Sequence, residues 1–332
     1  LVLTMTAGGF LGLIISTFFI GFANAAVEAA CNPLIAGMYK EKQTTMLNKF
    51  HVWFPGGIVI GSLVSGVMAD MGWQAQIGIM LIPTVLYAYL IWGQKFPAID
   101  KVVGNTATNI KSLANPLFIF MALCMTLTAA TEFSTTQWVE KILGASGANP
   151  MLILALVTGL MAVGRYFAGP IIHRLNPAGV LLASAVIATL GVYMFSVVSG
   201  PMVYLAAITF AIGVCYFWPT MIGFTGEYLP KTGALGMSLV GGAGMFSMSI
   251  WNPIIGGWID DANARAVATG VTGNEAEIIA GQEVLGTLSI IPMILIGLFT
   301  ILYFYMRGRS KPDGHMGDIL DSDALATPSV GR

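Results

Sequence analysis

The sequence predicts an all-α membrane protein, a polytopic bundle of transmembrane helices. Its composition supports this in two ways: 56% of the 332 residues are hydrophobic and only 9% are charged, whereas a soluble domain carries roughly 25% charged residues. The apolar residues also lie in runs long enough to cross a bilayer as helices, which takes about 20 residues. We expect about nine such helices in this chain.

The candidate spans follow one another along the whole chain. In order they are 9–36, 52–71, 75–93, 116–138, 151–171, 178–199, 201–224, 233–258 and 285–306. Residues 1–8 are apolar as well, and we expect them to be the end of a preceding helix.

The Lys and Arg residues indicate the orientation, because cytoplasmic loops are enriched in them. If the loop after the first span is cytoplasmic, only Lys141 and Arg265 lie outside. The basic residues inside are then Lys40, Lys42, Lys49, Lys95, Lys101, Lys111, Arg165, Arg174, Lys231, Arg307, Arg309, Lys311 and Arg332. Loop 259–284 becomes external and the tail from Arg307 cytoplasmic, in a cell membrane that we expect to be a bacterial inner membrane.

Two stretches of the chain are alike. One begins "CNPLIAGMYKEKQ" at Cys31 and the other "CYFWPTMIGFTGEYLPKTG" at Cys215. In each, a glycine follows a proline four residues later, and a short charged loop leads into a Gly-rich helix. Such parallel repeats occur in secondary transporters and predict two related halves of about six helices each. The expected organisation is a partial N-terminal half (1–94), a cytoplasmic linker (95–115), a complete C-terminal half (116–306) and a cytoplasmic tail (307–332).

Glu28 is an acidic residue deep in the first span, in the stretch "NAAVEAACNPL". On a helix, Asn24, Glu28 and Asn32 share one face. A charge at the bilayer centre costs about 2.5–3.5 kcal/mol on insertion scales, so Glu28 should face water or a partner, or carry a proton. We predict that Glu28 binds a proton and that both Asn side chains contact a polar ligand. The alternative is that Glu28 only bonds a neighbouring helix.

A second acidic residue, Glu132, lies in the span that contains "TAATEFSTTQW". With Thr136, Gln137 and Trp138 it offers hydrogen-bonding groups and an aromatic ring, which suit the hydroxyls and the C–H face of a sugar. The alternative is that these side chains meet lipid headgroups at the external end of the helix.

Three further residues are candidates for substrate contact. His51 opens a Gly-rich helix and can titrate near neutral pH, or it is an interfacial residue. Trp218 and Asn252 each lie beside a proline, where a broken helix lines a cavity in many transporters. Both equally suit ordinary packing.

Three motifs resemble the major facilitator superfamily. "VEAACNPL" resembles the fourth-helix signature of its fucose:proton symporter branch, and "LNKFHVWFPGG" the start of the fifth helix, with His51 where that branch more often has Asn. "GRYFAGPIIHRLNPAGVLL" resembles the loop between the second and third helices of a half. The resemblance implies a bundle of twelve helices, and it implies that this chain begins near the end of the third of them. It also implies proton coupling at Glu28 and symport of a sugar by alternating access.

The arginines of the third motif are expected on the cytoplasmic side. We predict that Arg165 and Arg174 make loop contacts that hold the inward-closed state; the alternative is simple anchoring by positive charge. No Lys or Arg lies in mid-span, which argues against an anionic substrate.

Several other functions find little support. The net charge of −1 gives no reason to expect nucleic acid, and the three cysteines lie in apolar runs, unlike a metal site or disulfide framework. The motifs HExxH and GxSxG are absent from the sequence, so we expect no enzyme and no cofactor except the coupling proton. Apart from the bilayer and a small-molecule substrate we expect no partner, and a monomer. A facilitator for a drug or organic acid and a non-transporting nutrient receptor stay open.

Overall fold

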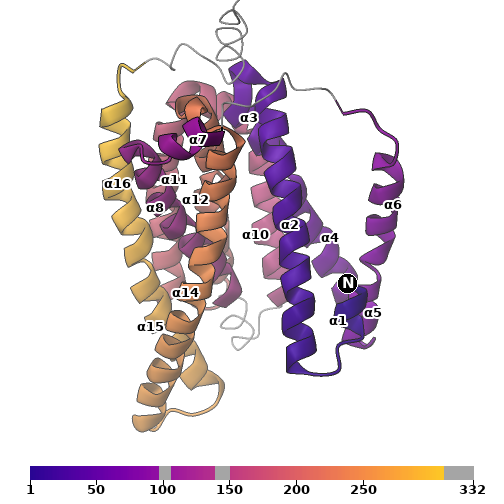
Figure 1. The fold of residues 1–332 in the computed structure, drawn as a ribbon. Helices are drawn as coiled ribbons and strands as arrows, with labels where there is room; N and C mark the ends of the chain where they lie inside the picture. Colours follow the sequence, from indigo (N-terminus) through magenta and orange to yellow (C-terminus); the bar gives the residue numbers. More distant parts are fainter. Residues whose placement is uncertain (97–105, 139–149, 310–332) are drawn as a thin grey trace, which may run out of the picture.

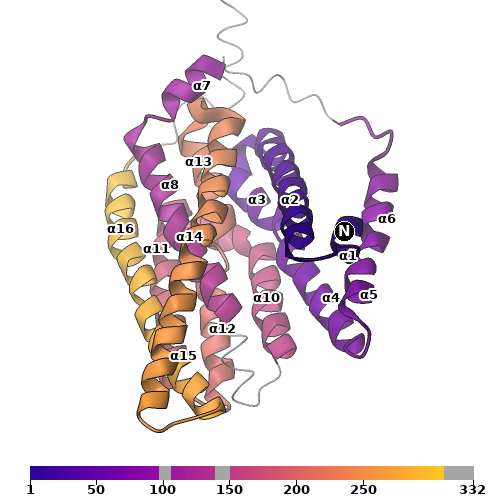
Figure 2. The ribbon, with the colours of Figure 1, turned by 60° about the horizontal axis from the view of Figure 1, so that its bottom comes forward.

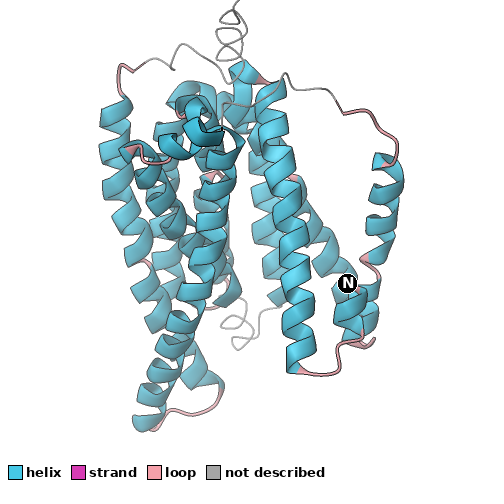
Figure 3. Cartoon of the chain, in the orientation of Figure 1, coloured by secondary structure: helices cyan, strands magenta, loops and turns pink. Residues whose placement is uncertain are grey.

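The computed structural model describes residues 1–96, 106–138 and 150–309. This part of the chain is built of helices, without strands (Figure 1, Figure 3). Eight helical segments are long and apolar enough to cross a membrane, and α10 (Pro150–Tyr166) is a shorter apolar helix. Together they coincide with the nine predicted spans. The prediction of an all-α membrane bundle is confirmed.

The helices before residue 97 form an N-terminal group. They are α1 (Val2–Met5), α2 (Phe10–Met38), η1 (Lys40–Lys42), α3 (Gln43–Phe50), α4 (Trp53–Val67), α5 (Trp73–Gly78) and α6 (Leu81–Ile91). Helices α3 and α4 belong to one span that is interrupted at His51 and Val52. Helix α6 stands at the edge of the molecule, away from α2, in both views (Figure 1, Figure 2).

The helices after residue 105 form a C-terminal group. They are α7 (Thr106–Ser112), α8 (Pro116–Ala129), η2 (Ala130–Ser134), α10, α11 (Ala168–Val197), α12 (Met202–Val214), α13 (Phe217–Tyr228), η3 (Pro230–Thr232), α14 (Gly233–Ala268), α15 (Asn274–Leu288) and α16 (Ile290–Met306). The predicted domain boundaries near residues 94 and 115 stay predictions.

Burial differs sharply between the two groups. In the most apolar window of α2 only 6% of the residues are buried, and in that of α5–α6 none are, whereas the window of α12–α13 is 72% buried. The continuous apolar core is accordingly built almost entirely of C-terminal side chains. In the N-terminal group, most apolar side chains are exposed, as they would be toward lipid.

The connection between α10 and α11 differs from its prediction. Helix α10 ends at Tyr166 instead of residue 171, and α11 begins at Ala168 with a kink at Asn176, whose φ is 55°. Asn tolerates this left-handed conformation better than most residues. Its Oδ1 accepts a hydrogen bond from the Gly179 backbone N–H at 3.0 Å, and Pro177 follows it. An N-cap residue followed by proline is a typical start of a helix. Asn176 and Pro177 therefore begin a new helical segment, close to the predicted start at residue 178.

The prediction of a loop over residues 259–284 is wrong for most of this stretch. Helix α14 continues to Ala268 and α15 begins at Asn274, so only residues 269–273 connect them. The two helices form a long hairpin that extends past the rest of the bundle (Figure 1). The stretch after Asp261 is rich in alanine, the strongest helix former, and needs no lipid to stay helical.

The two groups meet along α2, α3 and α4 on one side and α10, α13 and α14 on the other; we call this contact the inter-group interface. At one end of it α13 lies directly on α3, since a Cβ added at Gly223 would lie 2.5 Å from Thr44 Oγ1. There the Glu227 carboxylate accepts a hydrogen bond from the Thr44 backbone N–H at 3.0 Å. A carboxylate at a helix N-terminus is stabilised by the helix dipole.

Candidate functional site

Glu28 faces the C-terminal group across the inter-group interface. Its side chain is half-buried, Asn32 one turn further is buried, and Asn24 one turn earlier is exposed. The Glu28 carboxylate lies close enough to interact with the Trp218 and Asn32 side chains and within electrostatic reach of Arg165. A Cβ added at Gly241 of α14 would lie 3.8 Å from Glu28 Oε2. Of the predicted polar face, Glu28 thus points at α13 and α14, Asn32 is buried next to it, and Asn24 is exposed.

Arg165 is the most deeply buried charged residue described, with 1% of its surface exposed. Its Nε donates to the Cys215 carbonyl oxygen at 2.8 Å, and one terminal nitrogen donates to the His51 carbonyl oxygen at 3.2 Å. Four residues after these two carbonyls stand Pro219 and Pro55. Since proline has no N–H, neither carbonyl can receive its helical hydrogen bond. Arg165 therefore satisfies two carbonyls that prolines leave free, one in each group.

The other terminal nitrogen of Arg165 pairs with Glu132. Glu132 Oε1 lies 3.3 Å from this nitrogen, and both side chains are almost fully buried. The second carboxylate oxygen, Oε2, is buried and has no hydrogen-bond partner among the residues that the structure describes. Glu132 lies in the π-helical turn η2, and such turns are frequent at functional sites.

Close helix approach lets Arg165 reach this position. A Cβ added at the preceding Gly164 would lie 2.7 Å from Cys215 Sγ, so a larger residue would push α10 away from the junction of α12 and α13. The Tyr216 hydroxyl donates to the Gly164 carbonyl oxygen at 3.2 Å and the Cys215 thiol to the Met161 carbonyl oxygen at 3.3 Å. These bonds hold the junction against α10.

His51 is buried at the junction of α3 and α4. Its Nδ1 lies 2.9 Å from the Leu47 carbonyl oxygen, and its buried Nε2 has no hydrogen-bond partner in the described part of the chain. One turn before, the Asn48 amide donates to the Thr44 carbonyl oxygen at 2.9 Å and lies 3.4 Å from Thr220 Oγ1 of α13. This second polar contact crosses the inter-group interface.

The chain as a whole matches a known family. The model of the Major Facilitator Superfamily matches residues 1–252, about three quarters of the chain. The chain belongs to the major facilitator superfamily. It is therefore a multi-pass membrane protein of a family of secondary transporters, whose members bind small-molecule substrates within the membrane. A comparison with curated proteins finds no match.

The structure places Arg165 elsewhere than predicted. Arg165 does not lie in a cytoplasmic loop but inside the bundle, where it is paired with Glu132. The prediction came from the resemblance of "GRYFAGPIIHRLNPAGVLL" to a superfamily loop, although the predicted span 151–171 contained Arg165. The prediction that no Lys or Arg lies in mid-span is not contradicted, because Arg165 is the second-last residue of α10, but its basic side chain is buried inside the bundle. Arg174 is exposed, as a surface role requires.

The other predicted residues of this superfamily carrier are dispersed. Trp218 is buried, with its ring edge-to-face with Phe133 at 5.7 Å between centroids, and belongs to the Glu28 environment. The Thr136 hydroxyl donates to the Glu132 carbonyl oxygen at 2.6 Å, which engages it within its own helix. Gln137 is exposed. Trp138 and Asn252 are half-buried. The Trp138 ring packs beside Gly256 of α14, and Asn252 belongs to α14.

Sequence reasoning did not select Asn48, Gly164 or Cys215. Asn48 lies in a helix with a buried polar side, and the quoted motif "LNKFHVWFPGG" contains it. The role of Cys215 comes from its backbone carbonyl, so only the proline four residues later could have indicated it.

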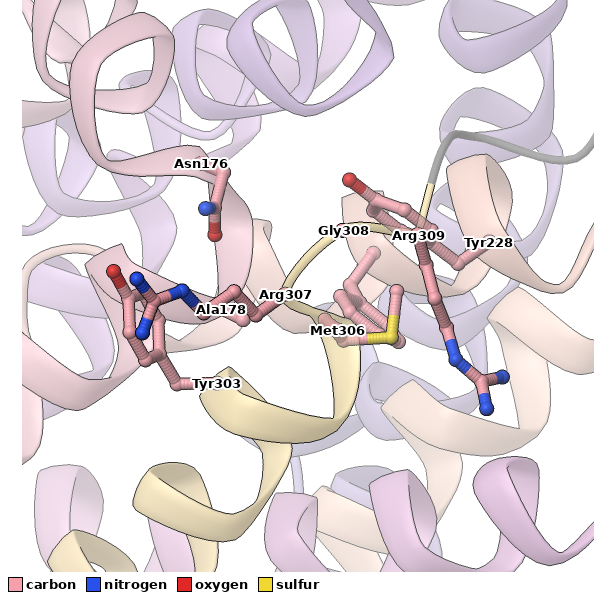
Figure 4. Close-up of a pocket in the computed structure, with 9 residues that line it drawn as sticks. Asn176, Ala178, Tyr228, Tyr303, Met306, Arg307, Gly308 and Arg309 are labelled. Atoms are coloured by element: carbon pink, nitrogen blue, oxygen red, sulfur yellow. The ribbon is translucent and has the colours of Figure 1, made fainter.

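A cavity of about 200 Å³ lies elsewhere, at the end of α13 farthest from Trp218. It is bounded by the kink of α11 at Asn176 and by the ends of α13 and α16 (Figure 4). Its lining includes Tyr228, Tyr303 and Arg307 but none of the predicted substrate residues.

Proposed function

We propose that this superfamily member carries a sugar in symport with a proton by alternating access. The observation that carries the proposal is the position of Glu28, whose carboxylate faces Trp218 and Gly241 of the C-terminal group from α2. Carboxylates inside transporters serve as proton relays. An aromatic ring next to a carboxylate and an amide suits the mixed polar and apolar faces of a sugar.

The resemblance of "VEAACNPL" to the fucose:proton symporter branch supports the same assignment of Glu28. In this proposal Glu28 takes up a proton from one side, Asn32 and Trp218 contact the solute, and the two groups rock about the inter-group interface. The protein acts as a monomer in a bacterial inner membrane with its C-terminal tail in the cytoplasm, and the proton is the coupling ion.

A second candidate substrate is an organic acid, because Arg165 is a buried basic residue beside the site. In this structure, however, all three of its hydrogen bonds go to protein acceptors. An anion would have to displace Glu132 to reach it. We therefore favour the neutral sugar.

The test is uptake by cells that lack their own sugar carriers. Labelled monosaccharides and labelled organic acids are supplied with and without a protonophore. A symporter that moves one charge across about 100 mV gains about 2.3 kcal/mol, which supports a concentration ratio of roughly 50. We expect a labelled sugar to accumulate to about this ratio, and we expect the accumulation to be lost when the protonophore is present.

Glu28→Gln should reduce the accumulation ratio to about one while retaining sugar exchange across the membrane, since the amide cannot bind the proton. The matched control is Glu283→Gln in α15, which alters an exposed carboxylate away from the site. Accumulation that survives the protonophore would refute the proposed proton coupling. Uptake of organic acids without uptake of sugars would refute the sugar as the substrate and favour an organic acid.

A further inference from the structure

The two buried carboxylates of the site share a single arginine. Glu132 pairs with Arg165 at 3.3 Å, and Glu28 lies within electrostatic reach of the same guanidinium. If both carboxylates are ionised and His51 is neutral, these groups carry one net negative charge between the helices. Unbalanced buried charge is costly, so the binding of one proton would neutralise the site.

Glu132 is held more loosely than its partner. Within the residues 1–96, 106–138 and 150–309, only one of its carboxylate oxygens is hydrogen-bonded, at a distance longer than the usual 2.7–2.9 Å of charge-assisted hydrogen bonds. Arg165 also has the carbonyl oxygens of Cys215 and His51. Loss of the carboxylate charge would leave Arg165 with two acceptors, whereas Glu132 has no second donor in the described residues. Glu132 is thus the member of the pair that can change its protonation state.

Arg165 connects this carboxylate to the N-terminal group. Its hydrogen bond to the His51 carbonyl oxygen crosses the inter-group interface. The same guanidinium pairs with Glu132, and this pairing helps to orient it for the bond to His51. The remaining titratable groups that face the pair are the Cys215 thiol, which donates to a carbonyl, and the neighbouring Tyr216 hydroxyl, which does the same.

We propose that Glu132 is a second proton-binding carboxylate of the carrier, and that Arg165 transmits its charge to the contact between the two groups. The proposal rests on the proton coupling proposed above. With Glu132 ionised, Arg165 is held toward His51 and the groups stay in contact. A proton from water converts the Glu132 carboxylate to a neutral carboxyl, the guanidinium keeps its charge and turns toward Glu28, and the contact at His51 loosens. Release of the proton to water on the other side restores the pair.

The test follows the distance between the groups as a function of pH, without any substrate. Spin labels are placed at Lys42 and Arg307, exposed residues of the N-terminal and C-terminal groups, after replacement of Cys31 by alanine; the buried Cys124 and Cys215 are kept. Pulsed electron resonance on the purified carrier in nanodiscs then compares mildly alkaline with mildly acidic buffer. The wild type should shift its distance distribution, and Glu132→Gln should show the acidic distribution in both buffers.

The controls separate the possible outcomes. Glu283→Gln should keep the full shift, and Arg165→Lys should lose most of it, because a lysine cannot bond three separate acceptors in the same fixed geometry. If Glu132→Gln shifts like the wild type while Glu28→Gln does not shift, the second site is refuted and the proposed function stands. A shift that survives both substitutions would refute proton coupling at either residue.

A measurement on the unmutated chain guards against misfolded variants. Dicyclohexylcarbodiimide is an apolar reagent that reacts with protonated carboxyl groups and stays attached to them as an N-acylurea, and mass spectrometry locates this adduct. Glu132 should be labelled increasingly as the buffer becomes acidic. Labelling that is independent of pH, or confined to Glu28, would overturn the proposal.

Discussion

At the scale of single residues, Arg165 shows how a buried charge can become a structural necessity. Pro55 and Pro219 each remove a backbone donor, and the freed carbonyls of His51 and Cys215 converge on one guanidinium. A buried carbonyl without a donor costs roughly 1–3 kcal/mol, so Arg165 stabilises the fold as well as the site.

A glycine contact gives the first residue-scale prediction. Gly223→Leu should destabilise the carrier by about 1–3 kcal/mol, because the new side chain collides with Thr44 of α3. The thermal midpoint in detergent, followed by tryptophan fluorescence, measures this. The matched control is Gly242→Leu, since a Cβ there meets nothing within 4 Å. Equal midpoints for both variants would contradict the observed approach of α3 and α13.

The sequence was sufficient to select Glu28, because a carboxylate in an apolar run with amides on the same face is readable from spacing alone. It was not sufficient to place Arg165. What holds this arginine inside the bundle is a carboxylate 33 residues away and two proline-freed carbonyls on other helices, and such long-range contacts leave no local pattern.

At the scale of elements, interrupted helices build the site. Helix α3 gives way to α4 at His51, α12 to α13 at Cys215, and a π-helical turn surrounds Glu132. Each interruption frees backbone groups, and each contributes one residue to the Arg165 environment. The prolines and the Asn-Pro start of the second part of α11 could be read from the sequence. The length of the α14–α15 hairpin could not, because its charged residues look like a loop although alanine keeps them helical.

The α14–α15 hairpin carries the element-scale prediction. Arg265 and Glu283 form an ion pair at 2.7 Å, but both side chains are about half exposed. Exposed pairs contribute roughly 0.2–1 kcal/mol. Arg265→Gln should therefore lower the thermal midpoint only slightly and leave uptake unchanged. A loss of stability as large as that of Gly223→Leu would show that the hairpin depends on this pair.

At the scale of the whole molecule, specific polar contacts join the two groups within an interface where helices of both groups pack together. At one end the Glu227 carboxylate binds the first turn of α3, and deeper in the interface Arg165 binds the His51 carbonyl oxygen. Alternating access requires such contacts to form on one side while they break on the other. The repeat predicts two related halves, and this stays a prediction, but no pattern in the sequence indicates which side chains join the two groups.

The Glu227 contact can be tested without a substrate. Glu227→Ala should accelerate amide hydrogen exchange in α3 by roughly tenfold or more, because a hydrogen bond to a charged group contributes about 1.5–3 kcal/mol. Exchange measured by mass spectrometry on peptides covering 43–50 reports this. Glu227→Gln should be intermediate, since its amide oxygen still accepts a bond without the charge. Unchanged exchange in the alanine variant would show that the interface is held elsewhere.

The hairpin of α14 and α15 also has a practical consequence. Its two helices run past the bundle and are joined by only residues 269–273, so a rigid soluble domain spliced between them would continue both helix axes. Such a fusion would supply the asymmetric mass that electron cryomicroscopy needs to align particles of so small a carrier, and would allow its different states to be imaged directly.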